Sequence, residues 1–168
     1  MAGLTAAIQL KKAGFDPVIF EKESKVGAGR HGDYEGLDNW IFSRNVPTFF
    51  KQSAFKFNDL TTYPISRFFV HTLFGKPITI QNNQPFFYMV KRGSGINDLD
   101  YQLYRQCKEI GVRFKLGKKA PGTCHIIATG SRKAAAYIRG INFKTTLKNQ
   151  VHLLLGSQFA PKGYAYLI

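Results

Sequence analysis

The chain has 168 residues, of which 24 are Lys or Arg and 10 are Asp or Glu, giving a formal net charge of +14 at pH 7. Hydrophobic residues make up 44% and aromatic residues 14% of the chain, which is enough to fill a core and excludes a disordered protein. No apolar run approaches the roughly 20 residues that a membrane-spanning helix needs. The two cysteines and four histidines show neither a disulfide framework nor metal-ligand spacing. The composition favours one folded domain, alone or with part of a second.

The positive charge is distributed unevenly along the chain. After Glu109 the sequence contains ten Lys or Arg residues and no acidic residue. This asymmetry favours an anionic partner, such as nucleic acid, lipid headgroups or a phosphorylated ligand, although a solvated basic face explains it equally well. Aromatic side chains concentrate in residues 40–88 and the charge in residues 110–162. Because nucleic-acid modules interleave the two, this separation disfavours nucleic acid.

The first predicted elements are a helix and a strand. Residues 2–13 have an apolar helical stripe and are followed by Gly14, a natural helix stop. Residues 17–20 are continuously apolar, lead into Glu21 and predict a short buried strand. A helix, a glycine turn and an apolar strand that ends in an acid form the second half of a βαβ unit, whose first strand the sequence does not include.

The rest of the chain predicts a sheet and a return to alternating helix and strand. Residues 24–39 are glycine-rich and predict a loop, and residues 41–92 contain short aromatic and β-branched runs that predict an antiparallel sheet. The remaining predicted elements are a helix over 98–110, strands over 112–116 and 125–128, a helical turn over 133–139, and strands over 151–155 and 163–168.

One spacing in this pattern indicates chemistry. Gly3 and Glu21 are 18 positions apart (21 − 3), with the predicted helix and strand between them. In a dinucleotide-binding βαβ unit, the helix begins at the pyrophosphate and an acid at the end of the second strand binds the ribose hydroxyls. The spacing fits the roughly 20 residues expected. Many helix–strand pairs end in an acid, so an ordinary structural pair remains open.

Several segments, in order, extend this indication to a family resemblance. They are AGLTAAIQLKKAGFDPVIFEK, VGAGRHGDYEGLDNW, PFFYMVKRG, DLDYQLYRQCKEIGVRF, HIIATGS and PKGYAYLI. Together they resemble the FAD-dependent oxidoreductases of the geranylgeranyl reductase family. The resemblance covers residues 2–168, with residues 41–84 matching only in general character.

The sequence departs from the family pattern at four points. Met1 stands at the proline of the family's G-x-G-P motif, whose two glycines would lie before it, and the family's later G-D motif would lie after Ile168. The stretch Gly27–Gly29 has one residue more than the usual glycine pair. We therefore expect an internal piece of a longer flavoprotein, one that by itself binds flavin weakly and is not catalytic.

The resemblance assigns roles to residues of the first half. Ala2 and Gly3 would present backbone groups to the FAD pyrophosphate, or form a plain helix start. Glu21 would bind the adenosine ribose with Lys22 beside it, or the two would be a solvated charge pair. Arg30 would approach the pyrophosphate or the flavin edge, where its fork of donors suits phosphate, or would be one of 24 basic residues.

The resemblance also assigns roles near the C-terminus. Ala128, Thr129 and Gly130 form the family's A-T-G turn, where the chain would turn away from the cofactor; an ordinary strand-end turn is the alternative. Tyr164 and Tyr166 would line the place where a prenyl substrate meets the flavin, although alternating aromatic residues of a strand are more often core. The sequence indicates no catalytic residue and no metal ligand.

These inferences predict an α/β fold: a partial Rossmann-like FAD-binding domain with an inserted antiparallel β-sheet on the substrate side. The expected segments are a partial FAD-binding βαβ unit with the glycine loop at 1–40, the substrate-side sheet at 41–92, a return to the FAD-binding domain at 93–150, and the start of a second substrate-side segment at 151–168.

The resemblance implies that the full-length protein binds FAD and reduces carbon–carbon double bonds of a geranylgeranyl-type prenyl chain, with an unspecified electron donor. Two alternatives remain: another flavoprotein monooxygenase or dehydrogenase on the same fold, and a non-catalytic basic module that binds nucleic acid or an anionic membrane. We expect a cytoplasmic protein with a prenyl-lipid or other small-molecule substrate and peripheral contact with an anionic membrane surface.

Overall fold

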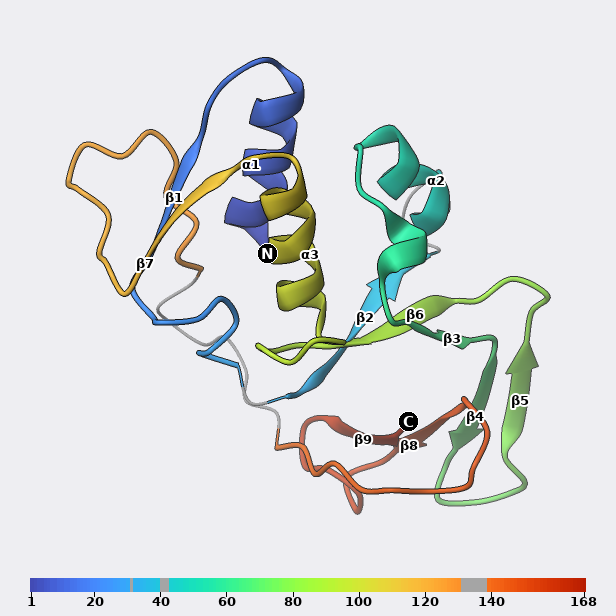
Figure 1. The fold of residues 1–168 in the computed structure, drawn as a ribbon. Helices are drawn as coiled ribbons and strands as arrows, with labels where there is room; N and C mark the ends of the chain where they lie inside the picture. Colours follow the sequence, from blue (N-terminus) through green and yellow to red (C-terminus); the bar gives the residue numbers. More distant parts are fainter. Residues whose placement is uncertain (31, 40–42, 131–138) are drawn as a thin grey trace. The chain divides into compact units, whose positions relative to one another are not determined.

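The computed structural model describes residues 1–30, 32–39, 43–130 and 139–168. The chain divides into two compact units, each built from three separate segments. Unit 1 comprises Met1–Glu35, Pro47–Thr61 and Val90–Asn142, and unit 2 comprises Gly36–Val46, Thr62–Met89 and Phe143–Ile168. Figure 1 shows the elements of both units along the chain.

Unit 1 holds the helices and one pair of strands. Its elements are α1 (Ala2–Lys12), β1 (Val18–Glu21), α2 (Val46–Gln52, apart from its first residue), a 3-10 turn (Phe57–Asp59), α3 (Leu99–Glu109) and β7 (Arg113–Leu116). β1 and β7 are parallel, with Val18 opposite Arg113 and Glu21 opposite Leu116. Parallel neighbours require a crossover connection, so this pair is the α/β part of the fold.

The two long helices of unit 1 pack on each other through apolar stripes. In α1 the buried residues include Leu4 and Ile8, and in α3 they include Leu99, Leu103 and Cys107. Spacings of four residues place these side chains on one helix face. Both helices lie within one or two residues of the predicted bounds, 2–13 and 98–110, and these predictions are confirmed.

Unit 2 is built almost entirely from strands. They are β2 (Tyr34–Asp38), β3 (Tyr63–Ile65), β4 (Arg67–His71), β5 (Ile78–Gln81), β6 (Phe87–Lys91), β8 (Val151–Leu155) and β9 (Tyr164–Leu167), with the ends of β2 and β6 in unit 1. They form a three-stranded sheet in the order β2-β6-β3 and a four-stranded sheet in the order β5-β4-β8-β9. Ile65, Met89 and Val151 form the core, with Phe68 and Phe87 packed against it.

Four details differ from the sequence prediction. The predicted loop over 24–39 contains strand β2, because its residues 34–38 pair with β6. The predicted sheet region over 41–92 contains α2 and the 3-10 turn, since Pro47 suits the first turn of a helix. The pairs β3–β6 and β4–β5 within this region are antiparallel as predicted, but β4 also gains a parallel neighbour from outside it, strand β8.

The fourth difference is the predicted strand over 125–128, which is irregular. Ile126 and Ile127 are 51% and 75% exposed, and in the described part of the chain the parallel sheet of unit 1 consists of β1 and β7. A strand without a neighbour leaves its backbone groups without ladder hydrogen bonds, so it does not form. The predicted helical turn over 133–139 lies outside the described residues except at Arg139.

Candidate functional site

The amino end of α1 offers backbone donors without side-chain caps. No side chain caps the helix at Met1, and the first turn contains no acidic residue. The Thr5 hydroxyl donates instead to the carbonyl of Ala2, at 3.0 Å. The first N–H groups of a helix lack intrahelical partners and, with the helix dipole, form a natural site for an anion. Ala2 has only a methyl side chain and Gly3 has none, and the Met1 ammonium group lies 3.7 Å from a carboxylate oxygen of Asp100.

The chain returns to the start of α1 at residue 128. A Cβ atom built on Gly3 would lie 3.4 Å from the Cβ of Ala128, an ordinary van der Waals contact. Gly130 follows with φ +76°, a conformation that favours glycine and turns the chain sharply. Gly3 and Ala128 are two of the residues singled out from the sequence, so the structure brings together parts of the candidate site that are distant in sequence.

Glu21 lies at the carboxyl end of β1, where the chain enters the glycine-rich loop. One of its carboxylate oxygens, Oε1, accepts a hydrogen bond from the backbone N–H of Glu23 at 3.0 Å. Within the described residues the other oxygen makes no hydrogen bond, so it has acceptor capacity for a hydroxyl group. Lys22 forms an exposed ion pair with Glu23 at 3.4 Å, and surface pairs of this kind contribute little stability.

Arg30 is held by two carboxylates, one in its own loop and one at the start of β2. Its Nη2 donates to Asp33 and to Glu35. Its Nε atom is buried and has no hydrogen-bond partner among the described residues. A buried donor without a partner is costly, so this N–H is a group that an anionic ligand would satisfy.

A buried ion pair supports the same loop, and the sequence analysis did not single it out. Arg92 Nε and Nη2 donate to the two carboxylate oxygens of Asp100 at 2.7 and 2.9 Å, and Arg92 Nη1 donates to Glu35. Burial opposes charge on Asp100, but the hydrogen bonds and the charge of Arg92 outweigh it and lower the pKa of Asp100 below its ordinary value. The signal in the sequence is the second of two acids, Asp98 and Asp100, at the start of a predicted helix, eight positions after Arg92.

The loop before Arg30 passes very close to the backbone that follows β6. A Cβ on Gly27 would lie 2.3 Å from the carbonyl oxygen of Gly93, and Gly27 has φ +76°. Both facts require glycine at this position. The Gly93 N–H in turn donates to Asp100 at 3.1 Å. The glycine-rich loop is therefore fixed by the segment that carries the Arg92–Asp100 pair.

Tyr164 and Tyr166 lie on β9 of unit 2, where their ring centroids are 6.1 Å apart with an interplanar angle of 36°. The two side chains are 58% and 45% exposed. Both rings lie on the same face of the strand, because alternate residues of a strand point the same way. They are surface aromatic side chains in the described chain and not core residues.

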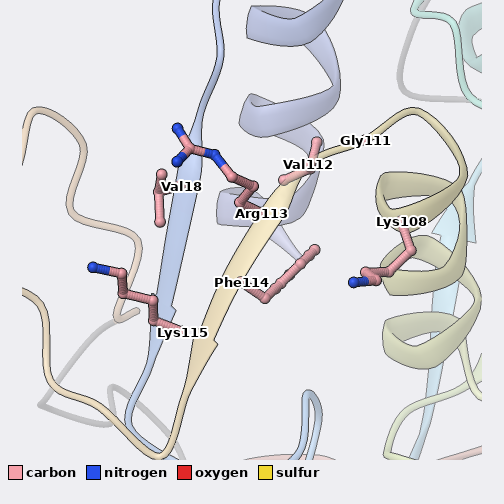
Figure 2. Close-up of a pocket in the computed structure, with 7 residues that line it drawn as sticks. All are labelled: Val18, Lys108, Gly111, Val112, Arg113, Phe114 and Lys115. Atoms are coloured by element: carbon pink, nitrogen blue, oxygen red, sulfur yellow. The ribbon is translucent and has the colours of Figure 1, made fainter.

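A depression of about 460 Å³ lies beside β7 in unit 1. Figure 2 shows Arg113 and Lys115 on β7 and Lys108 on α3 among its lining residues. It lies mainly toward the amino ends of β1 and β7, next to Val18 and Gly111. Ligands of open parallel sheets bind at the carboxyl ends of the strands, so we do not assign the cofactor to this depression. Among the described residues, no group of three His, Cys, Asp or Glu side chains could hold a metal ion.

One family profile and several solved structures are similar to parts of this chain. Residues 1–56 match the profile of a family described as flavin containing amine oxidoreductase. Two mutant forms of 2-methyl-3-hydroxypyridine-5-carboxylic acid oxygenase have similar structures, each 21% identical in sequence, with TM-scores of 0.50 and 0.51. Each similarity covers 69% of this chain and 29% of the oxygenase chain. A search of curated proteins found no significant match.

The structural similarity confirms the predicted fold class, a partial Rossmann-like α/β domain with an added sheet. The chain spans 29% of the length of these oxygenases. The family match at residues 1–56 agrees with FAD as the expected cofactor and with an oxidoreductase as the broad class. Neither comparison concerns the reduction of prenyl chains.

Proposed function

We propose that this chain is part of an FAD-dependent oxidoreductase, and that the start of α1 and the carboxyl end of β1 hold the ADP half of the cofactor. The observation that carries this proposal is the amino end of α1, which no side chain caps and where Gly3 lies against Ala128, together with the flavin family match over the same residues. A helix start without side-chain caps fits a pyrophosphate.

The residues of the site fit FAD in distinct ways. Ala2 and Gly3 would present backbone N–H groups to the pyrophosphate, and Glu21 would accept hydrogen bonds from the adenosine ribose with its remaining oxygen. The buried Nε of Arg30, which has no partner in the described chain, would donate to a phosphate oxygen. Thr129 and Gly130 would turn the chain away from the cofactor, and Lys22 would add positive charge beside the ribose.

Bound FAD would supply the hydride transfer, while the protein orients the substrate and excludes water. We propose a geranylgeranyl-type prenyl chain as the substrate, with Tyr164 and Tyr166 as aromatic contacts for it. Their exposure on β9 leaves both rings open to an apolar ligand. A flavin monooxygenase is the second candidate, because the similar structures belong to an oxygenase.

The cofactor proposal is tested by comparing three flavins. The chain is titrated with FAD, FMN and riboflavin, and binding is followed by quenching of flavin fluorescence. The affinity should be highest for FAD, lower for FMN and lowest for riboflavin. Glu21→Gln should lower the affinity for FAD several-fold and leave that for FMN unchanged, because FMN has no adenosine ribose. Glu23→Gln, which changes a neighbouring carboxylate whose side chain is 45% exposed, is the matched control.

Equal affinity for FAD and riboflavin would overturn the proposed pyrophosphate site. The reaction is tested on the full-length protein with reduced pyridine nucleotide as the electron source. Consumption of a prenyl diphosphate without uptake of oxygen supports the reductase, whereas oxygen uptake coupled to hydroxylation of an aromatic acid supports the monooxygenase and overturns prenyl reduction.

A further inference from the structure

One end of the four-stranded sheet in unit 2 carries two loops. The loop over 72–77 follows β4, and the loop over 156–163 follows β8. β4 and β8 are parallel neighbours, with Phe68 opposite Val151 and His71 opposite Leu154. Because both loops leave the carboxyl ends of parallel strands, they lie at the same end of the sheet. We call the two loops together the loop end; Figure 1 shows the first of them joining β4 to β5.

The loop end exposes apolar side chains in both loops. Phe74 is 83% exposed and Leu73 58% exposed in the first loop, and Phe159 is 41% exposed in the second. Ile78, where β5 begins, is 60% exposed, and Leu155, where β8 ends, is 38% exposed. Single apolar residues on a surface are normal, but this many at one end of one sheet indicate a binding surface.

The same two loops are positively charged. Lys76 lies in the first loop and Lys162 in the second, and both are exposed. Neither forms a salt bridge within the part of the chain that the structure describes. The sequence contains no acidic residue over 60–97 or after Glu109, so neither loop carries a carboxylate that would balance its lysine.

We propose that the loop end docks on an anionic lipid bilayer. Phe74, Leu73 and Phe159 would enter the boundary between headgroups and acyl chains, and Lys76 and Lys162 would contact the anionic headgroups. Apolar tips with basic residues within three positions have the chemistry of an interfacial anchor, where apolar burial and attraction to anionic lipid act together. No helix of the described residues is long and apolar enough to cross a membrane. The proposed contact is one between the loop end and the bilayer surface. The proposal is independent of the flavin site.

The experiment is sedimentation of the chain with vesicles of phosphatidylcholine alone or phosphatidylcholine with 30% phosphatidylserine, at two salt concentrations. We expect binding to the mixed vesicles, little binding to phosphatidylcholine alone, and weaker binding at high salt because screening shortens the range of the charges. The paired change Lys76→Gln with Lys162→Gln should weaken binding roughly thirtyfold, from roughly 1 kcal/mol for each basic residue at the surface. The paired change Phe74→Ser with Phe159→Ser should weaken it at least about tenfold, through loss of apolar burial.

Matched controls separate this surface from general basicity. Lys118→Gln with Lys119→Gln removes the same charge from exposed positions of unit 1, and Phe15→Ser removes an aromatic ring that is 62% exposed in unit 1. Both controls should bind like the unchanged chain. Equal losses in the controls and the loop-end variants would overturn the proposal. So would light scattering that shows a dimer broken by Phe74→Ser without binding to vesicles, because a second copy would then be the partner.

Discussion

Arg92 and Asp100 form a buried, bidentate ion pair, with N–O distances of 2.7 and 2.9 Å. Arg92 is 8% and Asp100 3% exposed. Arg92 follows β6 directly and Asp100 lies in the first turn of α3, so the pair joins the end of a strand to the start of a helix. Glu35, the second residue of β2, which follows the glycine-rich loop, also binds Arg92. The pair therefore connects this loop to the rest of unit 1.

Asp100→Ala should destabilise the chain strongly. It leaves the Arg92 guanidinium buried without its main partner, and breaking a buried pair from one side costs about 3–5 kcal/mol. The lower end of that range is expected, since Glu35 still binds Arg92. The free energy of unfolding, measured by urea denaturation with far-ultraviolet circular dichroism, reports the loss.

Two further variants test whether the loss comes from the ion pair. Asp59→Asn, at an exposed position, should change stability by less than about 0.5 kcal/mol. Arg92→Met combined with Asp100→Leu should be more stable than Asp100→Ala, because apolar residues of similar size replace the pair without leaving a charge. If the double variant lost as much free energy of unfolding as Arg92→Met alone and Asp100→Leu alone lose together, the two residues would not be coupled.

The stability from Asp100 should depend on pH in one direction. Its pKa in the folded chain lies below the ordinary value of 3.8, so the folded state binds the proton less tightly than the unfolded state. The stabilisation by ionised Asp100 is therefore complete when the pH is above the ordinary pKa. It is lost as the pH falls through the lower pKa of the folded chain. The stability difference between the unchanged chain and Asp100→Asn should be constant from pH 7 to pH 5 and shrink below about pH 4. A difference that grew with acid would contradict this assignment.

Local patterns predicted much of the fold. The two long helices and the strands at β1, β7, β8 and β9 follow from apolar periodicity and from glycine stops, which act over a few residues. Strand β2 was missed because its central Gly36 and its polar residues are typical of loops, and only pairing with β6 selects the strand. The strand predicted over 125–128 failed for the opposite reason, since an apolar run needs a neighbouring strand.

The candidate site, like the fold, could be predicted from the sequence only where local patterns determine it. The spacing of Gly3 and Glu21 could be read from the sequence because one helix and one strand separate them. The contact between Gly3 and Ala128 is a tertiary relationship, and only the resemblance had grouped these residues. The carboxylates around Arg30 could not be predicted, because a charged side chain in a loop has no periodicity that indicates its partner.

Gly27→Ala should be much more harmful than Gly14→Ala. Both glycines have a positive φ, +76° and +87°, but a Cβ on Gly27 would lie 2.3 Å from the carbonyl oxygen of Gly93, whereas nothing lies within 4 Å at Gly14. Gly14→Ala should therefore lower the free energy of unfolding only by what it takes to hold alanine in the left-handed conformation, roughly 1–2 kcal/mol. Gly27→Ala adds a steric overlap that forces the loop away from Gly93. Thermal unfolding of the two variants compares the costs, and equal values would show that the loop moves freely.

The two cysteines should differ sharply in reactivity. Cys107 is fully buried on α3, and burial raises its pKa to about 12, while its Sγ donates to the carbonyl of Leu4 at 3.5 Å. The thiolate is the reactive form, so Cys107 should be inert at pH 8. Cys124 is partly exposed and should react. Ellman's reagent should release one equivalent of thiolate rapidly from the folded chain and a second only in denaturant. In the Cys124→Ser variant the rapid equivalent should disappear, and its persistence would show that Cys107 is accessible and that α1 and α3 do not pack as described.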